Sequence, residues 1–289
     1  MISIGDAELR RVEEMTIQSS VLHFTQDRAL IEAHRHWLAP HFLGTDDRWS
    51  NTFQSFILAV DGRIVVIDPC TGNGRPHPLH QFSGLDTPYI ERFAAAGVRP
   101  EEVDYVFCTH LHHDHCGWNT ELRGGRYVPT FPNARYLIAR READRWDPRR
   151  SGYRGFDWND GVFERSVLPV LEAGLAELID ARHRISRSLV IEPAPGHTLG
   201  HAMLHLESEA QEAYFSGDVF HHPLQLVRPE LQYGPADDLD QAIATRRRIL
   251  DLCIARTALI IPAHLPAPHA LRAHRQGGVV EFAVPSMSW

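Results

Sequence analysis

Six residues in the first half of the chain, His-Leu-His-His-Asp-His at positions 110–115, concentrate side chains that bind metal ions. His110, His112, Asp114 and His115 are all of metal-ligand type. The apolar run 103–108 directly before them is typical of a buried strand. Because side chains alternate between the two faces of a strand, His110 and His112 are expected to share one face, while Asp114 and His115 reach a second position close by.

A solvent-exposed loop that binds metal only adventitiously is the alternative interpretation of this run. Three further ligand-type residues argue against it, because each follows an apolar, strand-like segment. His197 comes after the strand-like residues 189–191, Asp218 after 213–215, and His264 after 258–261. Because imidazole and carboxylate side chains recur directly after strand-like segments, the sequence predicts a specific metal-binding site.

In the order and spacing of these motifs the chain resembles the metallo-β-lactamase-fold metal-dependent hydrolases, over about residues 53–264. The resemblance implies that one metal is held by His110, His112 and His197, that the other is held by Asp114, His115 and His264, and that Asp218 bridges both. Asp68 lies where this family has an aspartate that supports the ligands. Asp68, Thr198 and His201 are expected to hydrogen-bond the metal-bound imidazoles, although a packed strand residue is an equal alternative for His201.

The implied cofactors are two divalent metal ions per chain. A donor set of imidazole and carboxylate without thiolate favours Zn²⁺ and is also compatible with Fe, Mn or Co. The implied chemistry is hydrolysis by a hydroxide that bridges the metals, with Asp114 helping to orient it. His221 is a further catalytic candidate, as a hydrogen-bond donor to the substrate. The alternative is that His221 is a surface residue beside His222.

The resemblance leaves the substrate open between a lactone or ester, such as an acyl-homoserine lactone, and a phosphotriester, as in the methyl-parathion-hydrolase type. Lactonases of this fold usually have a tyrosine three residues after the bridging aspartate, and this chain has His221 there. A non-catalytic metal-binding protein of the same fold is the third reading. Fold alone does not choose among them.

The chain has 289 residues, of which 43% are hydrophobic, and this favours one domain over residues 1–289. Mixed strand and helix patterns predict the α/β class, and the resemblance sharpens this to a four-layer αββα sandwich. We expect a hairpin around Asp61-Gly62 and helices at about 88–97, 166–179 and 237–256. Residues 1–50 are expected to form an N-terminal extension. Residues 118–165 are expected to form either a lid or binding insertion, or a surface subdomain whose aromatic side chains pack on one another.

Composition also narrows the partners to a small-molecule substrate. The net charge of −8 and the lack of a basic block argue against nucleic acid. The sequence has no run of about 18 apolar residues, which is the length that a membrane-spanning helix needs. The start of the chain lacks a secretory pattern, and the four cysteines show no paired spacing, so a cytoplasmic location is expected. A homodimer is left open.

Overall fold

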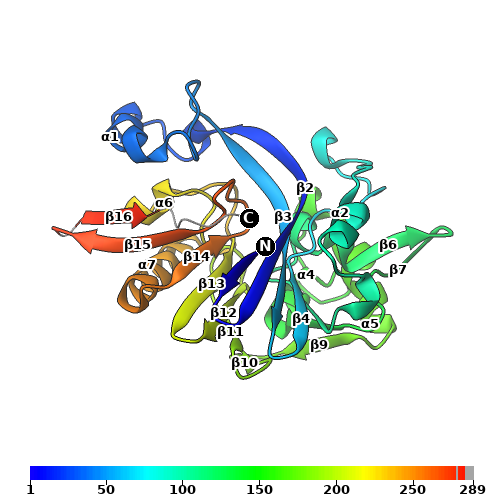
Figure 1. Ribbon diagram of the computed structural model, residues 1–289. Coiled ribbons are helices and arrows are strands. Elements are labelled where there is room, and N and C mark those ends of the chain that lie inside the picture. The colour runs from blue at the N-terminus through cyan, green and yellow to red at the C-terminus, as the bar shows by residue number, and fades with distance from the viewer. Residues whose placement is uncertain (278, 284–289) are drawn as a thin grey trace.

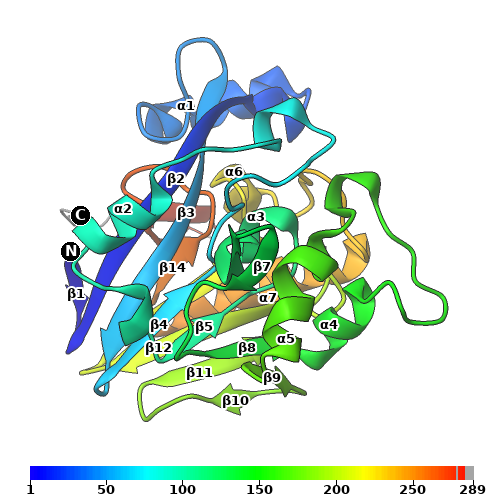
Figure 2. The same cartoon turned by 90° about the vertical axis from the view of Figure 1, so that its right-hand side faces the viewer.

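The computed structural model describes residues 1–277 and 279–283, and it confirms the αββα sandwich. Two seven-stranded sheets lie face to face in the centre of the molecule (Figure 1). In Figure 1 helices α2, α4 and α5 lie on the right, against the first sheet, and α7 lies on the left, against the second. Figure 2 views the molecule from the side of α4 and α5, which cover β8 and β9.

The first sheet has the strand order β1-β2-β3-β4-β5-β8-β9. Strands β1 to β4 are antiparallel neighbours, and β4, β5, β8 and β9 run parallel. The bounds are β1 Ile2–Ile4, β2 Ala7–Ser20, β3 Arg48–Val60, β4 Arg63–Ile67, β5 Tyr105–Phe107, β8 Arg135–Ala139 and β9 Ala176–Ile179. A separate hairpin pairs β6 (Thr120–Arg123) with β7 (Arg126–Pro129).

The second sheet follows the chain order from β10 to β16, with β13 and β14 as its one parallel pair among the described strands. Its bounds are β10 His183–Arg184, β11 Leu189–Pro193, β12 Ala202–Ser208, β13 Gln211–Gly217, β14 Leu259–Pro262, β15 Leu271–Gln276 and β16 Val279–Ala283. The helices are α1 Arg28–Leu38, α2 Tyr89–Ala95, α3 His113–Cys116, α4 Arg140–Trp146, α5 Leu168–Glu172, α6 Leu224–Val227 and α7 Leu239–Arg256.

Three apolar cores hold the four layers together. The central core between the sheets includes Leu58, Phe107, Leu204 and Phe215, all at most 2% exposed. One outer core packs α2 and the region of α4 and α5 on the first sheet, and the other packs α6 and α7 on the second. Each buried side chain of this size contributes on the order of 1.5–3 kcal/mol, so the layers form a rigid base for the loops at their edge.

Local signals predicted the hairpin and two of the three helices correctly. Asp61 and Gly62 have φ angles of 53° and 68°, as a tight hairpin turn between β3 and β4 requires. The Asp238 carboxylate caps α7 by accepting a hydrogen bond from the Gln241 backbone N–H at 2.9 Å. Helix α2 lies within the predicted range 88–97.

The helix predicted at 166–179 needs correction. A π-helical turn at Phe163–Val167 continues into α5, which ends at Glu172, and residues 176–179 form strand β9. Gly174, with φ of 70°, turns the chain out of the helix, and β9 then pairs with β8. The apolar spacing was misread because an edge strand of a covered parallel sheet lacks clear alternation.

The predicted N-terminal extension at residues 1–50 also needs correction, because most of its first twenty residues belong to the first sheet. Residues 2–20 are strands β1 and β2 of the first sheet, and only residues 21–47 leave it. This segment carries α1 and packs on the loop after β13, where Phe42 contributes to the same core as Phe220 and Leu224. The buried His222 donates a hydrogen bond from Nε2 to the Phe42 carbonyl at 2.8 Å.

The predicted insertion at 118–165 includes regular structure, since it contains β6, β7, β8 and α4. Only residues 147–162 form a long connection, interrupted by a 3-10 turn at Asp157–Asn159. No helix among the described residues is long and apolar enough to cross a membrane.

The buried His222 predicts a loss of stability in acid. Burial lowers its pKa to about 4, although its bond to Phe42 opposes this. The unfolded chain therefore takes up this proton first as pH falls from about 6.5 towards 4, which favours unfolding. We expect His222→Gln to shrink the loss of unfolding free energy between pH 7.5 and pH 5 by about 2 kcal/mol, as measured by urea denaturation at both pH values.

The exposed His36 of α1 offers a matched control for removing one histidine. The His36→Gln variant should lose as much stability as the unmodified protein between the two pH values. An unchanged loss in His222→Gln would show that His222 does not contribute to acid sensitivity.

Candidate metal centre

The ligand-type residues lie on loops that follow strands of both sheets. Strand β5 leads into His110 and then into the short helix α3, which carries Asp114 and His115. The second sheet supplies the other three: His197 lies between β11 and β12, Asp218 directly follows β13, and His264 follows β14. Apart from Asp114, which is partly buried, these side chains are at most 6% exposed.

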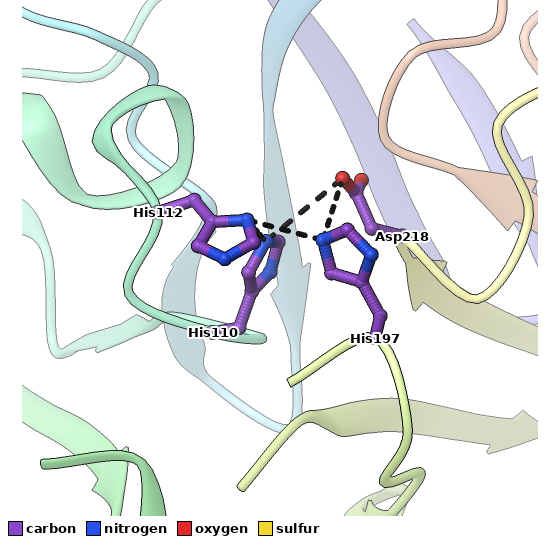
Figure 3. A group of neighbouring side chains, drawn as sticks. All are labelled: His110, His112, His197 and Asp218. Carbon is purple, nitrogen blue, oxygen red and sulfur yellow. Dashed lines mark hydrogen bonds and ion pairs between the residues drawn. The ribbon is translucent and has the colours of Figure 1, made fainter. Parts of the chain in front are cut away.

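A first group of ligand atoms comprises three imidazole nitrogens and one carboxylate oxygen (Figure 3). His112 Nδ1 lies 2.9 Å from His110 Nε2 and 3.1 Å from His197 Nε2. Asp218 Oδ2 completes the group, at 3.4 Å from His197 Nε2 and 3.9 Å from His110 Nε2. Three imidazoles and a carboxylate that converge in this way can surround one divalent ion.

A second group lies on the other side of the same carboxylate. His264 Nε2 is 3.2 Å from His115 Nε2 and 3.5 Å from Asp114 Oδ2. The second oxygen of Asp218, Oδ1, lies 3.2 Å from His264 Nε2 and 3.4 Å from His115 Nε2. The two oxygens of Asp218 thus face different groups, which is the arrangement a bridging ligand needs.

Hydrogen bonds outside the cluster orient three of the imidazoles. His115 donates from Nδ1 to Asp68 Oδ2 at 3.0 Å, and His264 donates from Nδ1 to the Thr52 carbonyl at 3.2 Å. Thr109 Oγ1 donates to Asp68 at 2.9 Å and therefore accepts from His110 Nδ1 at 3.0 Å. With a proton on each Nδ1, the Nε2 atoms of these rings point into the cluster, and each offers a lone pair there when its ring is neutral.

At His110, His112 and Asp218 the electrostatics favour the protonation states that bind metal. Burial and neighbouring imidazoles hold the pKa values of His110 and His112 well below the usual range. Burial alone would raise the pKa of Asp218, but His115, His221 and His264 outweigh it and hold this pKa well below the usual range. Neutral rings and an ionised carboxylate are the forms that coordinate a divalent ion.

The pKa of His115 is shifted in the opposite direction from those of His110 and His112. Burial lowers its pKa, but the carboxylates of Asp218, Asp114 and Asp68 outweigh this effect, so the net shift is well upward. A cation that binds among these carboxylates replaces the proton as their counter-charge.

Glu142 is a structural residue of the site that the sequence did not reveal. It is 1% exposed on α4, and burial raises its pKa. Its Oε1 accepts from the Leu111 N–H at 3.0 Å and its Oε2 accepts from Thr198 Oγ1 at 2.7 Å and from the Gly200 N–H at 3.1 Å. Glu142 therefore ties the loop of His110 and His112 to the loop of His197.

Thr198 and His201 were expected to hydrogen-bond the imidazoles of the ligand groups, but each has another partner. Thr198 bonds Glu142 instead of an imidazole. His201 uses Nε2 to accept from the Asp218 backbone N–H at 3.2 Å, so it supports the backbone of the central carboxylate and not another ring. Asp68 is placed as expected.

His221 is buried, at 3% exposed, so the surface alternative for it is wrong. It donates from Nε2 to Asp218 Oδ2 at 3.0 Å. Its backbone N–H bonds Gln225 Oε1 at 2.7 Å, and the buried Arg246 holds the same loop by donating to the Val219 carbonyl at 2.9 Å. The ring is thus fixed against the central carboxylate.

A cavity of about 330 Å³ opens above the two groups. Its floor includes ligand-type residues, and its walls are largely aromatic or apolar. The lining residues are Asn51, Phe53, Leu79, Phe82, His112, His113, Asp114, Trp158, His197, Asp218, His221, Tyr233, Gly234, Pro235 and His264. Tyr233 was missed because it lies in an irregular segment between α6 and α7 that carries no motif.

The chain matches one protein family and is similar to a curated lactonase. The family model described as the metallo-beta-lactamase superfamily matches residues 50–264. A curated N-acyl homoserine lactonase from Bacillus cereus is 26% identical over 113 residues, which span 39% of this chain and 36% of that protein.

Two solved structures are similar over almost their whole length. The dizinc quorum-quenching lactonase AidC, in complex with its product, is 18% identical with a TM-score of 0.77, covering 99% of this chain and 97% of that one. The hydrolase AbOPH is 20% identical with a TM-score of 0.79, at the same coverage. At these identities the likeness shows a shared fold.

Replacing Glu142 should loosen the ligand loops. In Glu142→Gln, an amide NH2 group would face backbone or indole N–H donors in a buried position, which costs roughly 1–3 kcal/mol. We expect lower stability in urea denaturation and faster loss of metal to a chelator. Glu172→Gln, on the exposed end of α5, is the control. Metal release at the unmodified rate in Glu142→Gln would refute its role in fastening the loops.

Proposed function

The chain belongs to the metallo-β-lactamase superfamily, and we propose that it is a dinuclear metal-dependent hydrolase that opens a lactone or cleaves an ester. The observation that carries this proposal is the position of Asp218. Its two carboxylate oxygens each lie within 3.4 Å of imidazole nitrogens from a different ligand group. A single carboxylate shared in this way supports a pair of ions and not two unrelated sites.

The residues present fit two divalent ions. Asp218 Oδ1 is buried and accepts no hydrogen bond within the described part of the chain, and inward-facing imidazole nitrogens surround it. We assign His110, His112 and His197 to one ion, Asp114, His115 and His264 to the other, and Asp218 to both, with Zn²⁺ as the favoured metal. When bound, such a pair supplies Lewis-acid polarisation of the scissile group and activation of water near neutral pH.

Asp114 is the residue we assign to handle the proton of the attacking water. It lines the cavity, and Oδ2 faces His264 and His115 at 3.5 and 3.8 Å. Burial would raise its pKa, but His113, His115 and His264 outweigh this and lower it, so the carboxylate is ionised and can accept a proton. As the water oxygen bonds to the carbonyl carbon, the carbon–oxygen bond to the leaving group breaks, and the leaving oxygen takes up a proton.

His221 is assigned to position Asp218. With Nε2–H bonded to Asp218, the neutral ring carries only a lone pair at Nδ1 and cannot donate to a substrate from there. Burial lowers the pKa of His221, despite the nearby Asp218, which keeps the ring in this neutral form. This replaces the expectation that His221 donates to the substrate carbonyl.

The cavity lining favours an uncharged substrate. No arginine is among its lining residues in the described chain, and the sequence contains no lysine. Among the described lining residues, the carboxylates of Asp114 and Asp218 are the only anionic side chains, and Phe53, Phe82 and Trp158 form apolar walls. Apart from the two proposed metal ions, a phosphate monoester or a free carboxylate would find no cationic group there, whereas a neutral lactone or ester with an apolar substituent would fit the apolar walls.

The likeness to lactonases supports a lactone over other esters, since the curated relative and the AidC structure are both lactonases by name. A phosphotriester hydrolase of the methyl-parathion-hydrolase type is the second candidate. The histidine at 221 favours it, because lactonases of this fold usually have tyrosine at that offset. A non-catalytic metal-binding protein is the third.

Action in the cytoplasm and the absence of a nucleic-acid partner remain predictions of the sequence, and the sequence leaves a homodimer open. All four cysteines are free and buried thiols, which agrees with a reducing compartment.

The proposal is tested by initial rates of the zinc-loaded protein on an acyl-homoserine lactone, an aryl ester and an aryl phosphotriester. We expect the lactone to be opened fastest, and Asp218→Ala to lose both metal and activity. Faster cleavage of the phosphotriester would favour the second candidate. Two bound metals with no turnover on any of the three would refute the hydrolase proposal for these substrates, and full activity in Asp218→Ala would refute the ligand assignment.

Replacing His221 should separate turnover from metal binding. His221→Phe removes the hydrogen bond to Asp218 but keeps a buried ring, so we expect kcat to fall about 10-fold to 100-fold with two metals still bound. His221→Gln can restore a donor at a similar position and should recover part of the rate. Equal kcat in all three proteins, with metal content measured by mass spectrometry, would remove His221 from the site.

A further inference from the structure

Two segments that are far apart in the sequence both contribute to the cavity wall. Residues 74–84 contribute Leu79 and Phe82, and residues 147–162 contribute Trp158. The Trp158 ring lies over the ligand-type residue His112, with ring centroids 4.7 Å apart. The position of Trp158 therefore determines how much space lies above this part of the site.

His77 joins these two segments. It donates from Nε2 to the Trp158 carbonyl at 2.7 Å and accepts at Nδ1 from the Leu79 N–H at 3.0 Å. Both bonds require the same neutral tautomer, with the proton on Nε2, so they support each other. Among the described residues this is the single hydrogen bond between the two segments.

Each segment is otherwise anchored at its base. The buried Arg75 donates to the Thr120 carbonyl at 2.6 Å and to the Gly117 carbonyl, and Gly84 closes the first segment by bonding the Arg75 carbonyl. In the second segment, Asn159 donates to the Leu111 carbonyl at 3.1 Å. These bonds hold each segment to the core of the site, whereas His77 holds the two segments to each other.

The ring of His77 also supports the aromatic wall. It lies edge-on to Phe82 at 5.3 Å between centroids and 4.2 Å from the ring of His113. Phe82 in turn packs edge-on against Phe53 at 5.2 Å. Loss of His77 would remove both the bond to Trp158 and the packing behind Phe82, so the link between the two walls would be weakened while each keeps its own anchor.

We propose that His77 is a specificity-determining residue that sets the width of the substrate cavity by holding Trp158 over the metal-ligand groups. The inference rests on the proposed hydrolase function of the same site. The closed wall admits a compact acyl or aryl group and excludes a bulky one. His77 acts through Trp158 and Phe82, so it positions the wall and takes no part in the chemical step.

Three variants test this on the zinc-loaded, full-length protein. His77→Ala removes the bond, His77→Gln can keep a donor near the Nε2 position, and His80→Ala, at an exposed histidine of the same segment, is the control. With N-butanoyl-homoserine lactone as substrate, His77→Ala should raise KM about threefold to tenfold with little change in kcat, because the wall contacts ground state and transition state alike.

Selectivity gives the sharper readout. The ratio of kcat/KM for N-dodecanoyl over N-butanoyl homoserine lactone should rise in His77→Ala and return towards the unmodified value in His77→Gln. A merely destabilising change would lower both rates together and leave this ratio unchanged. An unchanged ratio in His77→Ala, or the same ratio in His77→Gln as in His77→Ala, would overturn the proposal.

A readout that does not depend on activity separates this inference from the proposed function. The second segment exposes Arg149, Arg150 and Arg154, which are trypsin sites. Limited digestion should cut there faster in His77→Ala, and at the unmodified rate in His77→Gln and His80→Ala. If no protein hydrolyses either lactone, the proposed function fails, while equal digestion rates would show independently that His77 does not hold the wall.

Discussion

The carboxylate of Asp218 lies between two groups of buried imidazole nitrogens, and the surrounding structure compensates for the cost of keeping them together. Removing rings and carboxylates from water costs several kcal/mol per charged group unless partners are supplied. Here Asp68 and the Thr52 carbonyl bind the outer nitrogens of His115 and His264. The sheets provide the rigid base, and these outer bonds turn the lone pairs inward, so the cluster is prepared for divalent cations before they bind.

Two buried glutamates hold the loops of the site by hydrogen bonds. Glu142 bonds two ligand loops at once, and Glu14 on β2 accepts from the Thr71 and Gly72 N–H groups at 2.8 and 3.0 Å and from the Trp118 indole. Each carboxylate satisfies backbone donors that irregular segments would otherwise bury without partners. A Cβ at Gly117 would lie 1.8 Å from the Thr71 carbonyl oxygen, so the loops meet where only glycine fits.

The floor and the walls of the cavity determine different properties. The floor of imidazoles and carboxylates sets the reaction class, because these groups bind cations and handle protons. The aromatic walls lack cationic side chains among the described lining residues, and in our proposal they select the substrate by charge and size. The His221 ring belongs to the floor, since it bonds Asp218, and His77 belongs to the walls, since it bonds Trp158.

The sequence by itself determined the ligand-type residues, their order, and the elements with local signals, such as the turn at Asp61-Gly62 and the cap of α7 at Asp238. These were readable because strand ends, turns and caps depend on neighbouring residues. Strand β9 was not readable, because its pairing with β8 overrides its helix-like spacing. Glu142 bonds Leu111, 31 positions away, and His77 bonds Trp158, 81 positions away. Such partners meet only when the layers pack, so the tertiary structure alone decided how the site is fastened and how wide its cavity is.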